Sequence, residues 1–403
     1  MLIQIMISYL ILCLNLSKYS LWVLAKFLNL YLQTEFFHIY IVYVSMILKQ
    51  TTLKIFCAKK YNKYYFDDID SNDLVIETYS ANYEYDVDLS DLVTTIDEKC
   101  GIVDIDDIEI GNYIGKGTFG SVYIATYNKI KYAVKFTSNS KYSGLALSVY
   151  REIGSLKMLN HPNISSIYGY GVCDYNPTDH NSESSFIILE HIEYKLGEYL
   201  SDVANKLSVN NKIYKSLILN LMSAVNYLHE SKIAHRDICP NNILVTYNGS
   251  LKLIDFGMSC SFFHLDHSNY TNSNICTSYS RAIELAAEST NYNHKIDIWS
   301  CAVVILRILQ NSNPFGIVED DNELVLRSIF ATLGHMDKET QDKVNYFDKI
   351  KRYNAHPSYR KRGFPIIKEK FPQYLPIILS MLNYDPNKRP DAKHIHDYIY
   401  NIV

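Results

Sequence analysis

Apolar residues recur along this chain at two spacings, one typical of strands and the other of helices. Residues 110–135 alternate apolar and polar positions as half-buried strands do. Short apolar runs at 186–192 and 251–254 are typical of further strands. Apolar residues three or four positions apart occur at 150–164 and 213–230, where they predict helices. The pattern therefore predicts a mixed chain of strands and helices from about residue 110 onward.

Three glycines within the first strand-like region have a spacing typical of phosphate-binding loops. Gly115, Gly117, Gly120 and then Val122 read G-x-G-x-x-G-x-V. Glycines without side chains let backbone N–H groups approach phosphates closely. The same spacing occurs in dinucleotide-binding folds, where a helix follows the glycines. Here a strand follows them, and Lys135 arrives fifteen residues after Gly120, which argues against the dinucleotide alternative.

A second motif follows the helix predicted at 213–230. It is His235-Arg236-Asp237-Ile238-Cys239-Pro240-Asn241-Asn242, which reads H-R-D-x-x-x-x-N. Phosphoryl transfer needs a carboxylate beside the attacking hydroxyl and an amide oxygen for a metal ion. Asp237 and Asn242 fit these two needs. Asp255-Phe256-Gly257 comes eighteen residues after Asp237, and Asp255 is suited to bind magnesium that bridges nucleotide phosphates.

These motifs occur in the order and spacing of the eukaryotic-type protein kinases, which residues 108–403 resemble. The sequence around 150–164 and 381–389 is similar to the cyclin-dependent and MAP kinase group. The resemblance implies an α+β fold of two lobes: a small antiparallel-sheet lobe with one main helix, and a larger, mostly helical lobe. It also implies a serine/threonine protein kinase that uses ATP and Mg²⁺ to phosphorylate a protein substrate.

The resemblance implies a role for each residue of the site. Asp237 would be the catalytic base, Lys135 would hold the α and β phosphates, and Glu152 would pair with Lys135. Asn242 and Asp255 would be the magnesium ligands. The nucleotide-binding residues implied in this way are Ile114, Gly115, Lys116, Gly117, Thr118, Phe119, Gly120, Ser121, Val122, Lys135, Glu190 and Ile192.

The resemblance further implies contacts that hold the site together. They are His235 against Phe256, Asp297 against the backbone of the catalytic loop, Thr277 against Asp237, and an ion pair between Glu284 and Arg389. Threonine at position 277 favours serine/threonine over tyrosine specificity. Thr271 and Ser273 lie about where an activating phosphate would stand, with Arg151 and Arg236 to bind it.

Two positions depart from the family pattern. Cys239 stands where serine/threonine kinases usually carry a lysine that neutralises the transferred phosphoryl group. Ile283 replaces the proline of the A-P-E signature. The cysteine keeps open the alternative of a pseudokinase that acts as a scaffold or allosteric regulator. A small-molecule kinase is a third alternative, which the activation segment argues against.

The N-terminal hundred residues leave several interpretations open. Residues 1–48 are nearly continuously apolar, but their two charge-free stretches are shorter than the roughly 20 residues of a membrane span. They could be a membrane anchor, helices that pack on each other or on the kinase, or a translated extension upstream of Met46. Residues 49–107 read as a basic and then acidic linker. The stretch 67–109 holds fifteen Asp or Glu against Lys99 alone.

Composition limits the partners and the compartment. A net charge of -4 gives no case for nucleic acid. The eight cysteines form no C-x-x-C pair, which predicts reduced thiols in the cytoplasm, and in the host-cell cytoplasm if the AT-rich composition is viral.

Residues 338–370 carry ten Lys or Arg against four Asp or Glu. This stretch is either a solvated surface or a docking site, for an acidic partner or for this chain's own acidic segment.

Overall fold

The computed structural model describes most of the compact unit Val93–Val403. The interpretations of 1–48 and of nearly all of the 49–107 linker lie outside the described residues. So do Thr118, Phe119, Thr271 and Ser273. In the described part, no helix combines the length and the apolarity needed to cross a membrane. The described ranges are 100–117, 120–138, 147–173, 184–206, 211–262, 275–316, 319–356 and 362–402.

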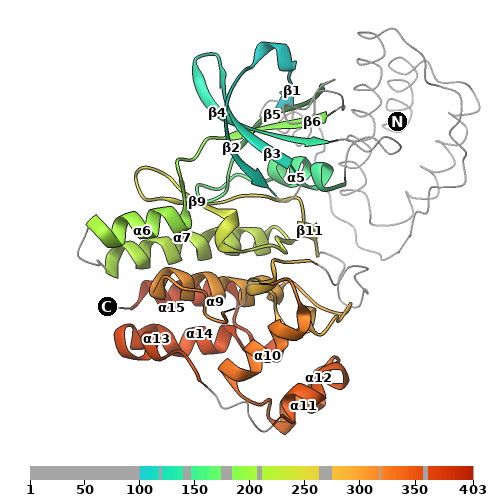
Figure 1. Ribbon diagram of the computed structural model, residues 1–403, viewed down its shortest axis with the longest axis vertical. Helices are drawn as coiled ribbons and strands as arrows, with labels where there is room; N and C mark the ends of the chain where they lie inside the picture. Colours follow the sequence, from blue (N-terminus) through green and yellow to red (C-terminus); the bar gives the residue numbers. More distant parts are fainter. Residues whose placement is uncertain are drawn as a thin grey trace, which may run out of the picture. The chain divides into compact units, whose positions relative to one another are not determined.

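The first lobe is a sheet with one helix packed on it (Figure 1). Its strand order in the described residues is β1-β5-β6-β4-β3-β2, and only β1 pairs in parallel, with β5. Phe136 and Phe186, each 0% exposed, lie at the centre of its core. β6 is buried between β4 and β5, which explains why its sequence is a continuous apolar run. The elements are β1 (Gly101–Ile102), β2 (Glu109–Gly117), β3 (Gly120–Tyr127), β4 (Ile130–Ser138), α5 (Leu147–Met158), β5 (Ile167–Cys173) and β6 (Ser184–Glu190).

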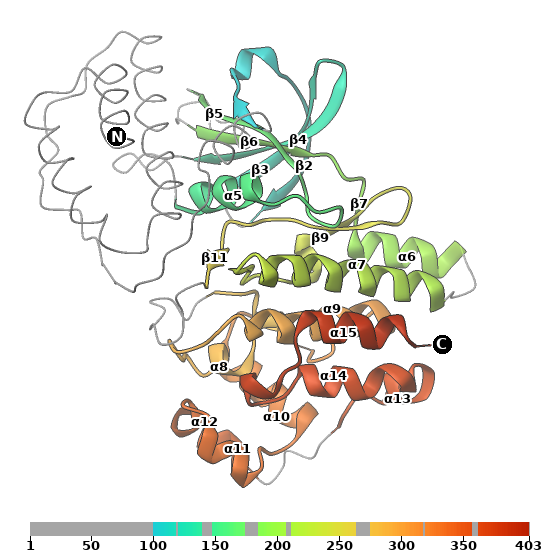
Figure 2. The same cartoon turned by 180° about the vertical axis from the view of Figure 1, so that it is seen from behind.

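The second lobe is built mainly from helices (Figures 1 and 2). Short strand pairs lie on the side that meets the sheet lobe and carry the loops of the predicted site. The elements are β7 (Tyr194–Lys195), α6 (Leu196–Lys206), α7 (Asn211–Glu230), β8 (Ile233–Ala234), β9 (Ile243–Val245), β10 (Leu251–Leu253), β11 (Cys260–Ser261), α8 (Ile283–Ala286), α9 (Lys295–Gln310), α10 (Asn322–Leu333), α11 (Lys338–Lys343), α12 (Phe347–Asn354), α13 (Pro365–Lys370), α14 (Leu375–Met381) and α15 (Ala392–Tyr400).

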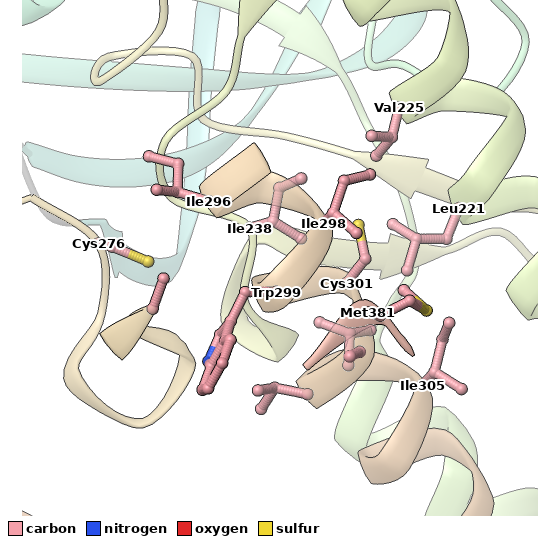
Figure 3. Packing of buried hydrophobic residues seen from close by; sticks show 14 of the residues in the cluster. Leu221, Val225, Ile238, Cys276, Ile296, Ile298, Trp299, Cys301, Ile305 and Met381 are labelled. Carbon is pink, nitrogen blue, oxygen red and sulfur yellow. The ribbon is translucent and has the colours of Figure 1, made fainter. Parts of the chain in front are cut away.

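Helix α9 is the centre of this lobe because its sequence is apolar on all sides. Such a helix is stable only when it is surrounded by other elements. Figure 3 shows Ile298 and Cys301 of α9 packed near Leu221 and Val225 of α7. Met381 of α14 packs in the same cluster. The core therefore connects α7, which precedes the catalytic loop, with helices from the end of the chain.

The predicted α+β fold of two lobes is confirmed by the sheet lobe and the helical lobe. The helical spacing at 213–230 corresponds to α7. The helix predicted within 150–164 is α5, which ends at Met158. Pro162 follows shortly after, and proline disfavours helical backbone at the residue before it.

A buried ion pair links α8 to the loop before α15. The two terminal guanidinium nitrogens of Arg389, Nη1 and Nη2, donate to the Glu284 carboxylate at 2.6 and 2.7 Å, and both side chains are at most 1% exposed. The Arg389 guanidinium also lies 5.0 Å from the ring centroid of Trp299. The implied Glu284–Arg389 contact is therefore present, despite Ile283 in place of proline.

We predict that Arg389→Met lowers the free energy of unfolding by about 3–5 kcal/mol, because it leaves the Glu284 carboxylate buried without its counter-charge. Urea denaturation measures the change. Glu323→Gln is the matched control, since Glu323 is 44% exposed in its ion pair with Arg327 and should cost under about 1 kcal/mol. Equal losses in the two variants would contradict the prediction.

Candidate active site

A buried carboxylate on α9 holds the catalytic loop in place. Asp297 accepts hydrogen bonds from the backbone N–H groups of His235 and Arg236, each at 2.9 Å, and from His229 Nε2 at 3.0 Å. Burial alone would raise the pKa of Asp297, but these donors outweigh it and lower the pKa. Arg236 adopts a left-handed backbone with φ of 66°, which turns the chain toward Asp237.

Asp237 has hydrogen-bond partners on both carboxylate oxygens. Oδ2 accepts from Asn242 Nδ2 at 2.8 Å. Oδ1 accepts from the Thr277 backbone N–H at 2.9 Å and from its hydroxyl at 2.8 Å. Burial raises the pKa of Asp237, the hydrogen bonds from Thr277 oppose this, and the nearby Asp255 charge adds to it. The result is a carboxylate held rigidly in one orientation.

Lys135, Glu152 and Asp255 form one buried polar cluster, although they come from β4, α5 and the loop after β10. Lys135 Nζ lies 2.8 Å from Glu152 Oε2 and 3.1 Å from Asp255 Oδ1. Burial alone would lower the pKa of Lys135, but the two carboxylates raise it. The lysine is therefore a permanent positive charge at the meeting point of the two lobes.

Gly117, where β2 ends, lies beside this cluster. A Cβ added to Gly117 would stand 3.6 Å from Lys135 Cε and 3.9 Å from Asp255 Oδ2. A Cβ at Gly120 would be 1.9 Å from the Phe136 carbonyl oxygen, so only glycine fits there. Val122 pairs with Lys135 in the β3–β4 ladder.

The residues present fit a nucleotide with magnesium. Both amide protons of Asn242 point to Asp237, to its carbonyl oxygen at 2.9 Å and to Oδ2 at 2.8 Å, so the amide oxygen is left for a cation. Ile254 N–H donates to the Asn242 carbonyl at 3.0 Å, which places Asp255 next to this residue. Amide and carboxylate oxygens are ligands that Mg²⁺ prefers.

β6 ends at Glu190, one of the implied nucleotide-binding residues. Its carboxylate accepts from Lys252 Nζ of β10 at 2.8 Å and from the backbone N–H of Ser166 at 3.3 Å. Ile192 is 6% exposed, and Leu189 pairs with Ala133 of β4. The sequence contained no signal for the Glu190–Lys252 contact, because it depends on how the two lobes meet.

Cys239 occupies the position of the missing lysine. Its side chain is buried, and the Thr277 hydroxyl lies 3.5 Å from its Sγ atom. Burial, and then the charge of Asp237, raise the pKa of the thiol to about 11. The residue is therefore neutral at physiological pH and supplies no charge beside Asp237.

The contact between Arg281 and Cys276 was not predictable from the sequence. Cys276 has a left-handed backbone with φ of 71°, and its carbonyl oxygen accepts from Arg281 Nε at 3.3 Å and Nη2 at 2.9 Å. This carbonyl directly precedes Thr277. No motif signals a backbone carbonyl held by a side chain five residues later.

The other implied contacts are present. The rings of His235 and Phe256 meet edge to face, with centroids 4.7 Å apart. Arg236 donates from Nε to the Met258 carbonyl at 2.7 Å and from Nη1 to the Tyr292 hydroxyl at 3.3 Å. Among the residues that the structure describes, no group of three or more His, Cys, Asp or Glu could hold a metal ion.

We predict that Cys239 reacts much more slowly with iodoacetamide at pH 8 than Cys260 does. A pKa of about 11 leaves about 0.1% of the Cys239 thiol ionised at that pH, and the side chain is buried, whereas Cys260 is half-buried. Mass mapping of the alkylated native protein measures both sites. The urea-denatured protein is the control, since both sites should react there. Rapid native labelling of Cys239 would show that the pocket is open or the thiol ionised.

Comparison with known proteins agrees with the geometry. The model of the protein kinase domain matches residues 108–400. Two proteins of Acanthamoeba polyphaga mimivirus, whose names include "serine/threonine-protein kinase", are similar to this chain. L673 is 34% identical over 71% of this chain and 50% of its own length. L268 is 32% identical over 72% of this chain and 51% of its own length.

This chain spans about half the length of those viral proteins. Its matched region holds the glycine-rich loop, the Lys135–Glu152 ion pair, the catalytic loop and Asp255. The match covers most of the chain, and the fold has the two lobes that the motifs imply. The chain belongs to the protein kinase domain family.

Proposed function

We propose that this chain is a serine/threonine protein kinase, which transfers the γ-phosphoryl group of ATP to a protein hydroxyl. Protein kinases as a family use ATP and Mg²⁺. The observation that carries the proposal is the carboxylate of Asp237. It is buried, held by Thr277 and Asn242, and close enough to Asp255 for the two charges to interact.

The proposed reaction is an in-line displacement. The substrate hydroxyl oxygen bonds to the γ-phosphorus, the bond to the β–γ bridging oxygen breaks, and ADP leaves. Asp237 orients the hydroxyl and accepts its proton. Lys135 binds the α and β phosphates while Glu152 holds its side chain. Asn242 and Asp255 would hold Mg²⁺, which neutralises charge that develops on the phosphates.

A pseudokinase is the alternative, and Cys239 is the observation that favours it. The buried neutral thiol supplies no cation to the phosphoryl group in flight. However, Lys135 keeps both of its carboxylate partners, and Asp237 keeps the hydrogen bonds that orient it. These are the features that an enzyme needs and a scaffold does not, so we favour catalysis.

The partners and location belong to the same proposal. We propose a protein substrate, an activating or docking protein partner, and a cytoplasmic site of action. The cysteines that the structure describes form no disulfide with one another, which suits a reducing compartment. A membrane anchor within residues 1–48 stays an open alternative.

We predict that Asp237→Asn lowers phosphoryl transfer at least about 100-fold, because it removes the proton acceptor. Nucleotide affinity should stay within about twofold, since the phosphates are held by other residues. Transfer of labelled phosphate from ATP to a generic protein substrate gives the first quantity, and calorimetry gives the second. Asp348→Asn is the control, because this aspartate is 95% exposed on α12.

Transfer by Asp237→Asn within about tenfold of wild type would remove Asp237 from its proposed role. Nucleotide binding without transfer in the wild-type chain would favour the pseudokinase instead.

The geometry around Cys276 also supports a preference in the substrate. Thr277 N–H donates to Asp237, so the Cys276 carbonyl lies within one residue of the place where the substrate hydroxyl must sit. The residue that follows the phosphorylated one would pass this carbonyl. Arg281 already occupies it, so a substrate N–H at that point finds no acceptor there. Proline has no backbone N–H, so a proline at this position leaves no hydrogen-bond donor without a partner.

We predict that peptides with Ser-Pro have kcat/KM at least about tenfold above matched Ser-Ala peptides, because a buried unpaired N–H costs about 1–3 kcal/mol. A Ser-(N-methylalanine) peptide separates the causes, since it lacks the N–H and also lacks the proline ring. It should behave like Ser-Pro. Arg281→Met should reduce the preference. Equal kcat/KM for all three peptides would overturn this assignment.

A further inference from the structure

Two serine hydroxyls connect α5 with the segment that follows Asp255. Ser155 Oγ lies 2.7 Å from Ser259 Oγ, although 104 residues separate them in sequence. Ser259 Oγ also lies 2.6 Å from the carbonyl oxygen of Phe256. Ser259 is 1% exposed, so bulk water does not replace either contact.

The hydroxyl protons determine which serine donates and which accepts in the Ser155–Ser259 hydrogen bond. A serine hydroxyl has one proton to donate and can accept at its oxygen. The Phe256 carbonyl can only accept, so Ser259 gives its proton to that carbonyl. Ser155 must then donate to Ser259. The contacts form a relay from the α5 side chain through Ser259 to the backbone of Asp255-Phe256-Gly257.

The position of Ser155 on α5 matters for the site. Ser155 comes three residues after Glu152, so the two side chains lie on the same face of the helix, about one turn apart. Glu152 forms the ion pair with Lys135. A displacement of α5 away from the large lobe would therefore break both contacts together.

We propose that Ser155 and Ser259 are positioning residues, which couple the place of α5 to the conformation of Asp255-Phe256-Gly257. The inference rests on the proposed kinase function for its effect on catalysis. With the relay intact, Glu152 stays against Lys135, and the Phe256 carbonyl stays linked to α5 through Ser259. Without it, α5 moves away from Lys135 more often, and the fraction of molecules with an assembled site falls.

Helix propensity and loss of the relay predict opposite effects of Ser155→Ala on amide exchange in α5. Ser155→Ala removes the relay but puts a better helix former into α5, so local propensity alone would slow amide exchange in this helix. Ser148→Ala is the matched control, because Ser148 lies in the first turn of the same helix and the described residues show no hydrogen bond from its hydroxyl. Ser155→Thr keeps the hydroxyl and serves as the rescue variant.

The experiment measures hydrogen exchange of α5 amides and the kinetics of phosphoryl transfer on the full chain. Ser155→Ala and Ser259→Ala should each speed α5 exchange and lower kcat by about fivefold, which corresponds to one lost hydrogen bond. The double variant should fall no further than either single variant, since one relay is removed. KM for the peptide should not change, and Ser155→Thr and Ser148→Ala should resemble wild type.

The outcomes separate this inference from the proposed function. Exchange in Ser155→Ala equal to or slower than wild type would overturn the coupling, whatever the activity. Additive losses of kcat in the double variant would also overturn it, because two independent effects would then be present. Faster α5 exchange in both single variants of a chain that transfers no phosphate would support the coupling and reject the kinase activity.

Discussion

The site depends on the carboxylate of Asp297, a buried anion in the first turn of α9. It gathers the backbone N–H groups of His235 and Arg236, and each would cost about 1–3 kcal/mol if it were left buried without a partner. These bonds keep Arg236 in its left-handed conformation, and Asp237 is the next residue. Because α9 is surrounded by the apolar core of the large lobe, the catalytic loop takes its position from the buried core of that lobe.

The same helix also positions the substrate side of the site. Ser300 of α9 donates to the Ser280 carbonyl at 2.9 Å, and Lys295 contributes a carbonyl to Arg389 at 3.1 Å. Thr277 and Arg281 lie on the segment held in this way. Asp237 is therefore fixed from two directions, through the catalytic loop and through Thr277. This double support explains how a carboxylate with a raised pKa keeps one orientation.

Cys239 changes the electrostatics of the site but leaves its geometry intact. Asp237 receives neutral donors, from Thr277 and Asn242, where a lysine would bring a positive charge. The positive charge identified in the cluster is Lys135, which faces Glu152 and Asp255. The described residues of the site are arranged to position the reacting groups. They supply less positive charge to the transferred phosphoryl group than the family pattern does.

The fold class and the principal site residues could be predicted from the amino-acid sequence. Spaced glycines, H-R-D-x-x-x-x-N and Asp255-Phe256-Gly257 carry that information locally, because each motif is a short stretch whose spacing follows from one turn or one strand. The contacts between Lys135 and Glu152 and between Glu284 and Arg389 were also predictable, through the family resemblance.

The distant groups that complete the site could be identified only in the folded chain. The Ser155–Ser259 relay joins residues 104 positions apart, and the Glu190–Lys252 contact crosses between lobes. Arg281 and Cys276, whose carbonyl it binds, are close in sequence. The contact nevertheless depends on the left-handed backbone of Cys276, which its residue type does not predict. Hydrogen bonds of this kind leave no periodic or compositional signal in the sequence, because they form when segments that are distant or separately structured pack together.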